Sequence, residues 1–478
     1  MDVLTTISPI NSKVLVATQA TTLDQLDSKI LPEVCAAQRK WHRSTSLAQR
    51  KELVLRAMEI LTDEKTIQTL AIDITRQMGR PIKYTPGELK TAALRARYLI
   101  DVSDQVLAPI NANNPKSASI EFENGFKKYI THEPLGVVLL IFPWNYPYLC
   151  LINALVPALL AGNAALIKPS PQTPLVAENI KSVFEKAGLP KGILQVVHSG
   201  DPLLIETLIQ RPSIAAVSFT GSVAGGLAIQ RAASSRTIPV ALELGGNDPA
   251  YVRTDVADLR ATAEDIVDGC IFNSGQSCCA IERVYVAAEI YDEFLSHVVD
   301  IVKAYKVGDP LEPSTQIGPL VSKQAADKVR AQVADAIKHG GRQLIPIGHF
   351  SKAESLNPTF VGPQVLVDMD DQALVLTEET FGPLIPIVKV HSDDEAVAKM
   401  NNSDLGLTAS IWTKDTAWGE ALGDLVEAGT VFVNRADYPD PALAWTGWKS
   451  SGRGVTLSQF GFDFFRRLKS HHIKQSKL

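Results

Sequence analysis

The chain has 478 residues, of which 45% are hydrophobic and 21% are charged, and its formal net charge is −5. This composition is average for a globular protein, and at roughly 100–200 residues per domain the length predicts two to four domains. The small negative charge argues against nucleic acid or an anionic membrane surface as a partner. The longest apolar stretch, residues 149–161, is too short to span a bilayer and contains Asn153 and Pro157, so we expect no membrane span.

The five cysteines are odd in number and show no regular spacing, which is not the pattern of a secreted disulfide framework. We therefore expect reduced thiols, of which at least one has a chemical role. The chain ends in Ser476-Lys477-Leu478, a tripeptide that peroxisomal import receptors read at a C-terminus. This ending predicts a peroxisomal location; a cytoplasmic location is the alternative if the tripeptide is a chance ending of a basic tail.

The first half of the chain changes its pattern twice. Residues 22–80 predict helices, because apolar residues recur at helical spacing, for example in 46–61. Residues 117–131 predict a β-hairpin, since two alternating segments flank Asn124-Gly125, a dipeptide that accepts the positive φ angles of a tight turn. An isolated two-stranded ribbon is only marginally stable, so we expect it to rest on other structure, such as a partner subunit.

From Val137 onward, apolar strands alternate with helices. The run at 137–142 is continuously apolar, which is typical of a strand buried on both faces. Further strands are predicted at 164–168, 193–197 and 215–221, separated by helices at 148–160, 174–187 and 202–210 and followed by a helix from 223. This alternation predicts a parallel α/β sheet. A second βα series covers about 246–440, and residues 455–478 resemble an added strand region.

Two segments contain side chains suited to carbonyl chemistry. In FNSGQSCCA (272–280), a Cys278 thiolate could attack a carbonyl carbon, provided that nearby donors hold the oxyanion. The alternative is that Cys278 and Cys279 are simply small buried side chains. In LELGGN (242–247), Glu243 lies between two leucines, where a raised pKa suits a general base. Its alternative is a carboxylate at a strand end that forms a salt bridge.

Two further segments are suited to a nucleotide. FTGSVAGG (219–226) forms a glycine-rich turn at the start of a helix, where free amides can bind phosphate. Its spacing is looser than the Gly-x-Gly-x-x-Gly fingerprint, so an ordinary βα turn is the alternative. Lys168 ends a predicted strand, and strand ends of a parallel sheet face the ligand crevice, where a lysine can bond to ribose hydroxyls. A solvated lysine is the alternative.

Taken together, these segments resemble the NAD(P)-dependent aldehyde dehydrogenase superfamily, in the same order and over nearly the whole chain. The matching motifs are FPWNYP (142–147), GNAALIKPS (162–170), FTGS (219–222), ELGGN (243–247), FNSGQSCCAIER (272–283), EETFGP (378–383), FVN (432–434) and KSSGRG (449–454). The resemblance implies an α/β fold with a Rossmann-like cofactor domain (1–116 and 134–244), an α/β catalytic domain (245–444) and a small β oligomerisation ribbon (117–133 and 455–478). It also implies a homodimer or homotetramer, an aldehyde substrate and no metal.

The resemblance assigns roles to individual residues. It makes Cys278 the nucleophile, Asn145 with the Cys278 amide the oxyanion donors, and Glu243 the base that activates water. An aldehyde would then be oxidised to an acid through a thiohemiacetal and a thioester. The residues implied to contact NAD or NADP are Phe142, Trp144, Lys168, Ser170, Gly221, Ser222, Gly226, Leu244, Glu379 and Phe381. Two alternatives stay open: an acylating relative that passes the thioester to coenzyme A, and a non-catalytic structural relative.

The sequence departs from the family pattern in three places. Pro171 stands where many NAD-preferring relatives carry a glutamate that repels a 2′-phosphate, so we expect both NAD and NADP to be used. Val455-Thr456 replaces a frequent Arg-Glu, so a secondary proton-relay carboxylate is missing. Arg435 lies in the loop expected over the substrate mouth; we interpret it as a solvated arginine, with attraction of an acidic aldehyde as the alternative. The residues expected to line the access tunnel are Tyr146, Leu149, Cys150 and Asn153.

Overall fold

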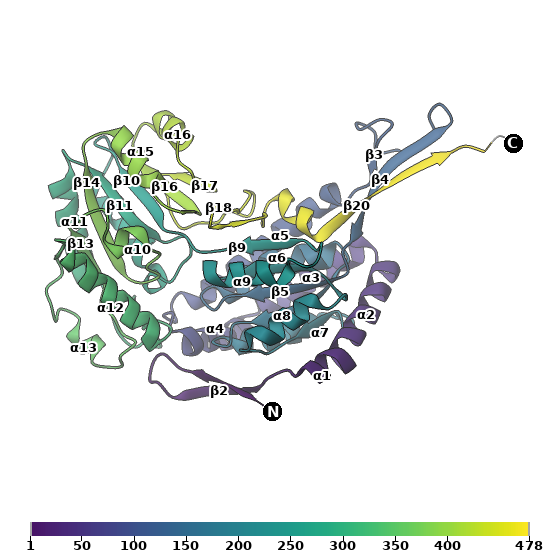
Figure 1. Ribbon diagram of the computed structural model, residues 1–478, viewed down its shortest axis with the longest axis horizontal. Helices are drawn as coiled ribbons and strands as arrows, with labels where there is room; N and C mark the ends of the chain where they lie inside the picture. The colour runs from purple at the N-terminus through teal and green to yellow at the C-terminus, as the bar shows by residue number, and fades with distance from the viewer. Residues whose placement is uncertain (1, 477–478) are drawn as a thin grey trace.

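The computed structural model describes residues 2–476, so Lys477 and Leu478 of the predicted Ser-Lys-Leu signal lie outside the described residues. Two lobes lie side by side, each built on one large sheet, and a β-ribbon projects from one of them (Figure 1). Within residues 2–476, no helix combines the length and the apolar character needed to cross a bilayer.

A six-stranded sheet forms the centre of the first lobe. Its strand order is β19-β9-β8-β5-β6-β7, and all neighbours are parallel except β19 and β9. The strands are β5 (Val137–Phe142), β6 (Ala164–Pro169), β7 (Leu194–Val196), β8 (Ile214–Thr220), β9 (Val240–Glu243) and β19 (Gly452–Arg453). Every residue of β5 is buried, as its apolar run predicts. The predicted parallel α/β sheet is confirmed.

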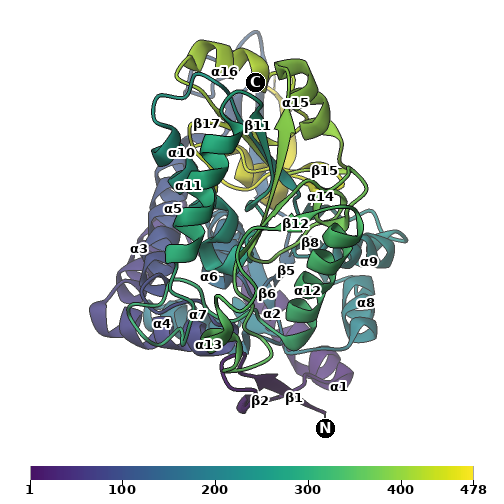
Figure 2. The same ribbon diagram turned by 90° about the vertical axis from the view of Figure 1, so that its left-hand side faces the viewer.

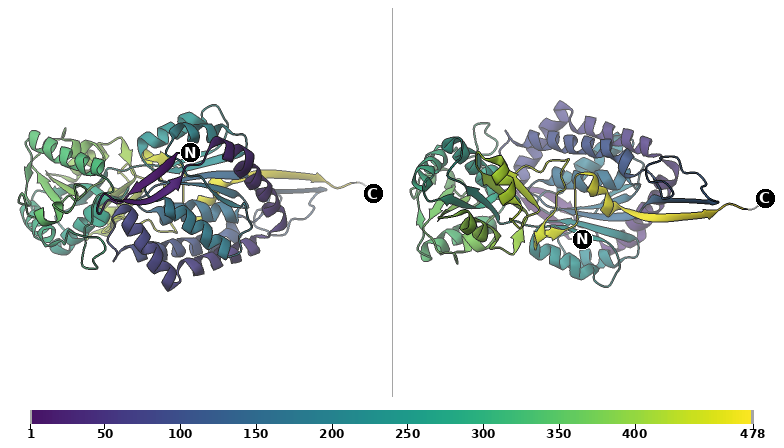
Figure 3. Two further views of the ribbon diagram at one scale, coloured as in Figure 1. Left: turned by 90° about the horizontal axis from the view of Figure 1, so that it is seen from below. Right: turned by 90° about the horizontal axis from the view of Figure 1, so that it is seen from above.

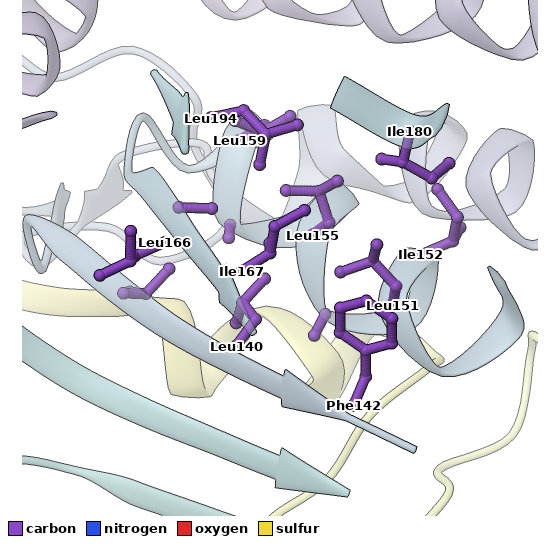
Figure 4. Close-up of a cluster of buried hydrophobic side chains, with 14 of the residues drawn as sticks. Leu140, Phe142, Leu151, Ile152, Leu155, Leu159, Leu166, Ile167, Ile180 and Leu194 are labelled. Carbon is purple, nitrogen blue, oxygen red and sulfur yellow. The ribbon is translucent and has the colours of Figure 1, made fainter. Parts of the chain in front are cut away.

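Helices cover both faces of this sheet, as the views from below and above show (Figure 3). The helices of this lobe are α1 (Leu23–Gln25), α2 (Leu31–Ser44), α3 (Leu47–Leu61), α4 (Glu64–Met78), α5 (Thr85–Val106), α6 (Pro147–Leu160), α7 (Pro174–Lys186), α8 (Pro202–Gln210) and α9 (Val223–Ala233). A π-helical turn, Leu26–Ile30, joins α1 to α2. Figure 4 shows side chains of β5 and β6, such as Leu140 and Ile167, among those of α6, such as Leu155.

The second lobe faces the viewer in Figure 2. It contains a seven-stranded sheet of order β12-β13-β14-β11-β10-β16-β17, which is parallel except at β12. Its strands are β10 (Asp248–Val252), β11 (Ile281–Ala287), β12 (Arg342–Gln343), β13 (Gln364–Val367), β14 (Leu384–Val390), β16 (Thr408–Trp412) and β17 (Thr430–Val433). Its helices are α10 (Leu259–Ile271), α11 (Tyr291–Ala304), α12 (Lys323–Lys338), α13 (Ser351–Glu354), α14 (Leu374–Thr377), α15 (Asp393–Asn401) and α16 (Thr416–Gly423). A small pair, β15 (Leu405–Gly406) and β18 (Trp448–Lys449), lies beside it. Only residues 244–247 separate β9 from β10, so the two large sheets approach each other there.

The ribbon consists of β20 (Arg466–Lys474), β4 (Phe126–Pro134) and β3 (Ile110–Asn111), in that order. The strands β4 and β20 extend well beyond the first lobe (Figures 1 and 3). All nine residues of β20 pair with β4 in an antiparallel register. The long partner of β4 is therefore the C-terminal strand.

The predicted hairpin at 117–131 is wrong in its first strand. Asn124 and Gly125 do form a turn with φ of 52° and 80°, but it is closed by a single bridge and no strand spans 117–123. The side-chain amide of Asn111 donates to the carbonyl of Ser119 at 2.6 Å, which folds the segment back on itself. Asparagine side chains compete with strand pairing in this way.

The chain ends also differ from the predicted arrangement. Phe462 and Phe465 are buried in the core of the first lobe, so within 455–476 only β20 belongs to the ribbon. A hairpin of β1 (Val3–Ile7) and β2 (Val14–Gln19), which the sequence analysis did not predict, packs beside the end of β6. There the Thr6 hydroxyl donates to the carbonyl of Pro171 at 2.8 Å.

A buried ion pair at the start of α5 holds the loop that follows β5. Arg80 and Glu88 are 2% and 4% exposed and are bonded to each other. Arg80 also donates to the carbonyl of Asn145 and, at 3.0 Å, to the side-chain oxygen of Asn273. The pair therefore fixes the loop that contains Asn145 and the segment that precedes Cys278.

We expect Glu88→Ala to lower the free energy of unfolding by about 3–5 kcal/mol, because it leaves the Arg80 guanidinium buried without its counter-charge. Chemical denaturation measures this change. The matched control is Asp327→Ala, which breaks the exposed pair with Lys323 and should cost no more than about 1 kcal/mol. Equal effects of the two substitutions would contradict the structural role of the buried pair.

Candidate active site

Cys278 lies in the loop between a 3-10 turn (Phe272–Gly275) and β11. Asn273 and Ser274 in that turn have φ of 54° and 60°, a left-handed conformation that needs support from the surroundings. That support is present, because the Asn273 side chain bonds to Arg80 and to the carbonyl of Gln276, at 3.0 Å each. The turn thus fixes where the loop presents the half-buried Cys278.

The double glycine between the sheets, Gly245-Gly246, lies against this loop. A Cβ at Gly246 would lie 2.5 Å from the carbonyl oxygen of Cys278, and one at Gly245 would overlap the carboxylate of Glu379. Any larger side chain would therefore separate the cysteine loop from the end of β9. The two glycines allow Glu243, Cys278 and Glu379 to converge from three different strands and loops.

Two cavities meet at Cys278. The larger has a volume of about 420 Å³ and the smaller about 200 Å³, and both are lined by Cys150, Thr220, Glu243, Leu244 and Cys278. A hollow of about 570 Å³ lies elsewhere, at the amino ends of β5 and β8. Because ligands of open parallel sheets bind at the carboxyl ends of the strands, we place the site at Cys278 rather than at this hollow.

Asn145 and Cys278 both line the smaller cavity. Asn145 is 4% exposed, and its side-chain amide donates to the carbonyl of Gln276 at 3.2 Å. An amide nitrogen carries two hydrogens, so one remains for an oxygen atom in the cavity. The Arg80 bond to the carbonyl of Asn145 fixes this residue from the other side.

Glu243 ends β9 and lines both cavities. Burial raises the pKa of this carboxyl, whereas hydrogen bonds from Thr456 and Thr220 and the charge of Arg95 lower it. Thr220 donates at 3.3 Å, and Thr456 donates to the other carboxylate oxygen. Many members of the family carry a glutamate where this chain has Thr456. In place of that carboxylate, this chain has a hydroxyl that bonds directly to Glu243.

The other side of the smaller cavity carries most of the residues expected to contact the cofactor. Trp144 and Phe381 meet edge to face with ring centroids 5.6 Å apart. The Glu379 carboxylate accepts a bond from the Gly246 amide at 3.1 Å, and burial raises its pKa. The predicted residues that line this cavity are Trp144, Gly221, Ser222, Leu244, Glu379 and Phe381.

Four of the residues predicted to contact the cofactor do not line this cavity. Phe142 is 3% exposed and lies in the core (Figure 4), because β5 is buried on both faces; its side chain is therefore not placed to touch a ligand. Gly226 lies inside α9, where it allows close packing against the side chain of Leu244. Lys168 and Ser170 lie at and just beyond the end of β6, one strand from the cavity.

The larger cavity contains the expected tunnel residues and several that the sequence analysis missed. Tyr146, Leu149, Cys150 and Asn153 all line it. Arg80, Arg95 and Asp437 line it too, although no local motif marks them, because they come from segments distant in sequence. Asp437 accepts bonds from Ser277 at 3.0 Å and Cys279 at 2.9 Å, and burial raises its pKa to about 6.

Comparisons with known proteins agree with this architecture. Residues 2–471 match the model of the aldehyde dehydrogenase family. The chain is 31% identical to 3,6-anhydro-alpha-L-galactose dehydrogenase of Streptomyces coelicolor over 99% of this chain and 93% of that protein. It is 32% identical to succinate-semialdehyde dehydrogenase [NADP(+)] 1 of Mycobacterium tuberculosis over 98% and 99%, respectively.

Two solved structures show the same fold. One is succinic semialdehyde dehydrogenase from Streptococcus pyogenes in complex with NADP+, with a TM-score of 0.90 and 27% identity over 98% of this chain and all of that one. The other is an indole-3-acetaldehyde dehydrogenase in complex with NAD+, with a TM-score of 0.91 and 28% identity over 99% and 94%. With the family match across its whole length, the chain belongs to the aldehyde dehydrogenase family and is an NAD(P)-dependent enzyme.

Proposed function

We propose that this dehydrogenase works through a covalent thioester on Cys278. The observation that carries the proposal is the position of Cys278 on the wall of two cavities, with Asn145 on one and Glu243 on both. One cavity can then admit the aldehyde and the other the nicotinamide, so that the sulfur, the substrate carbon and the hydride acceptor are neighbours. Such placement converts an encounter of three groups into a reaction within one complex.

In the first step, the Cys278 thiolate adds to the aldehyde carbon and forms a thiohemiacetal. The free amide hydrogen of Asn145 stabilises the oxyanion, and a positioned donor of this kind is typically worth a factor of about 10²–10³ in rate. A nicotinamide held by the residues of the smaller cavity would supply the hydride acceptor, so that loss of hydride from the thiohemiacetal carbon leaves a thioester on Cys278. Glu243 then takes a proton from a water molecule, and the oxygen of that water attacks the thioester carbon. The C–S bond breaks, which releases the carboxylic acid and restores the Cys278 thiolate.

The residues around the smaller cavity fit a dinucleotide. Ser222 caps the start of α9, where helix amides can bind phosphate, and Glu379 can accept bonds from ribose hydroxyls. The side-chain amino group of Lys168 forms no hydrogen bond or ion pair with residues 2–476, and burial lowers its pKa to about 8. Position 171 offers no carboxylate to repel a 2′-phosphate. We propose that both NAD and NADP are used.

The presence of Glu243 favours hydrolysis of the thioester over its transfer to coenzyme A, the reaction of an acylating enzyme. A thioester passed to coenzyme A needs no base for water, whereas here a carboxyl with a raised pKa lines both cavities beside Cys278. The name of one relative gives a semialdehyde as substrate and that of another gives a sugar aldehyde, so the names do not decide the substrate of this chain.

Assembly and location are also proposals. The ribbon β20-β4-β3 leaves strand edges free in one chain, which favours pairing with a second copy in a homodimer or homotetramer. The relatives described above are bacterial and give no support to a peroxisomal signal, so we retain the cytoplasmic alternative.

Cys278→Ala should abolish dehydrogenase turnover while cofactor binding persists, because the thiolate is lost and the smaller cavity is otherwise unchanged. The measurements are NADH or NADPH formation and cofactor titration by fluorescence. The matched control is Cys279→Ala, which removes the neighbouring thiol and should retain turnover. Near-normal activity of Cys278→Ala would end the proposal.

Thr456→Val should move the acidic limb of the hydrolysis rate to higher pH by roughly 1–2 units, because a hydrogen bond to a charged group is worth about 1.5–3 kcal/mol. Glu243 acts as a base only when ionised; losing the Thr456 bond raises its pKa further, so activity is lost at a higher pH as the solution is acidified. Steady-state kcat against pH measures this shift. Thr446→Val, which removes an exposed hydroxyl bonded to Gly454, should leave the limb in place. A profile that is equally unmoved in Thr456→Val would contradict the role of this bond.

The KM for NADP should rise between pH 7 and pH 9 more steeply than the KM for NAD. In the free enzyme, Lys168 loses its proton as the pH rises through about 8. Only the protonated lysine pairs with a 2′-phosphate, so at higher pH the enzyme must take up a proton before it binds NADP. Above pH 8, the affinity for NADP can therefore fall by up to about tenfold per unit. In Lys168→Met the difference in pH dependence should vanish. Strict use of NAD, or parallel curves for the two cofactors in the unmodified enzyme, would refute this account.

A further inference from the structure

Three arginines are buried in the described chain: Arg80, Arg95 and Arg283. A guanidinium stays charged, so its burial is costly unless partners compensate. Arg80 is paired with Glu88. Arg283 donates to the backbone carbonyls of four residues, at 2.9–3.3 Å. Two of the three are thus satisfied by the protein itself.

Arg95 is not satisfied in this way. It is 5% exposed on α5 and donates only to two neutral oxygens, the side chain of Asn153 at 3.3 Å and the carbonyl of Pro439 at 3.2 Å. Its Nε atom is buried without any partner. No carboxylate in the part of the chain that the structure describes forms an ion pair with it. The positive charge of Arg95 therefore lacks a carboxylate in direct contact.

The uncompensated charge lies on the wall of the larger cavity, which also contains Cys278. Arg95 acts on the same space as the base, since its charge lowers the pKa of Glu243. Between these polar groups the cavity wall includes apolar side chains, namely Leu149, Phe272, Leu407 and Trp445. A ligand with a reactive carbonyl at one end, a short aliphatic stem and an anion at the other end matches this arrangement.

We propose that Arg95 binds the carboxylate of the substrate, and that the preferred substrates are aliphatic aldehydes that end in a carboxylate. This inference rests on the proposed function, because it requires the aldehyde to be at Cys278. The planar guanidinium fork suits a carboxylate, which can accept from two of its N–H groups at once. The substrate then supplies the counter-charge that the protein does not.

Arg435, the arginine singled out from the sequence, does not fit this role. It lies over the ring of Tyr438 at 3.7 Å and lines a separate hollow together with Asp265 and Asp268. That hollow does not include Cys278, so an acid held there would not present its aldehyde to the nucleophile. Arg435 is therefore a matched control for Arg95.

The first test uses the unmodified enzyme and two aldehydes of equal shape. Succinate semialdehyde carries the carboxylate, and 4-methylpentanal replaces it with an uncharged isopropyl group. We expect kcat/KM to be at least about tenfold higher for succinate semialdehyde, since a hydrogen bond to a charged group is worth about 1.5–3 kcal/mol. Equal use of the two, or preference for 4-methylpentanal, would overturn the inference and leave the proposed function intact. If neither these nor any other aldehyde is oxidised, the proposed function itself fails.

The second test measures the same ratio of kcat/KM values in variants. Arg95→Met should lower the ratio roughly 10- to 150-fold, mainly through KM for succinate semialdehyde. Arg95→Lys should lower it less, because the charge remains, and Arg435→Met should leave it unchanged. An equal loss for both aldehydes in Arg95→Met would show that Arg95 acts only through Glu243 or on folding, and would refute carboxylate binding.

Discussion

The structure depends on the contact of the Gly245-Gly246 segment with the Cys278 loop and with Glu379. Only residues 244–247 separate β9 of the first sheet from β10 of the second, so the two lobes approach each other over this short segment. With no side chains at 245 and 246, the Cys278 backbone and the Glu379 carboxylate can occupy the space beside it. Glu243 from one lobe and Cys278 from the other thereby line the same two cavities, which share one wall.

The charged residues of the larger cavity differ in whether the protein pairs them, and this difference separates structural residues from residues that are available to a ligand. Arg80 is paired and therefore structural, because its bonds determine where Asn145 and the cysteine loop lie. Arg95 has no carboxylate partner and one nitrogen without a hydrogen bond, so we regard its charge as available to a ligand. Glu243 is balanced between burial, which raises its pKa, and two hydroxyl donors, which lower it. A change in these hydroxyl donors would therefore change the pKa of Glu243 without moving Cys278.

Much of the fold could be predicted from the sequence because its strands are buried on both faces. A continuous apolar run such as 137–142 has no other stable position, and the helices at 148–160, 174–187 and 202–210 are found within a residue or two of the predicted bounds. The hairpin at 117–131 was overpredicted, because the nearby Asn111 side chain offers hydrogen bonds that compete with strand pairing. The burial of the Phe142 side chain was not evident from its motif, because a motif residue at a strand end can point into the core.

The site residues that lie in recognisable sequence motifs could be predicted. Those that only the tertiary structure brings to the cavity could not. Cys278, Glu243 and Asn145 lie in recognisable segments, and the structure places all three on shared cavity walls. Arg95 comes from the middle of a long helix and Asp437 from a loop near the end of the chain, so no local pattern marks either. Their importance appears only when burial and missing partners are counted in three dimensions.

The central claim, that Cys278 carries the acyl group, is tested most directly by trapping it. Glu243→Gln should form the thioester but hydrolyse it slowly, so mixing it with an aldehyde and NADP+ and quenching in acid should preserve the adduct. Mass spectrometry of the intact protein should then show one added acyl group, and peptide mapping should place it on Cys278. An unmodified protein after NADPH has formed, or an acyl group on Cys150 or Cys279 instead, would contradict the account.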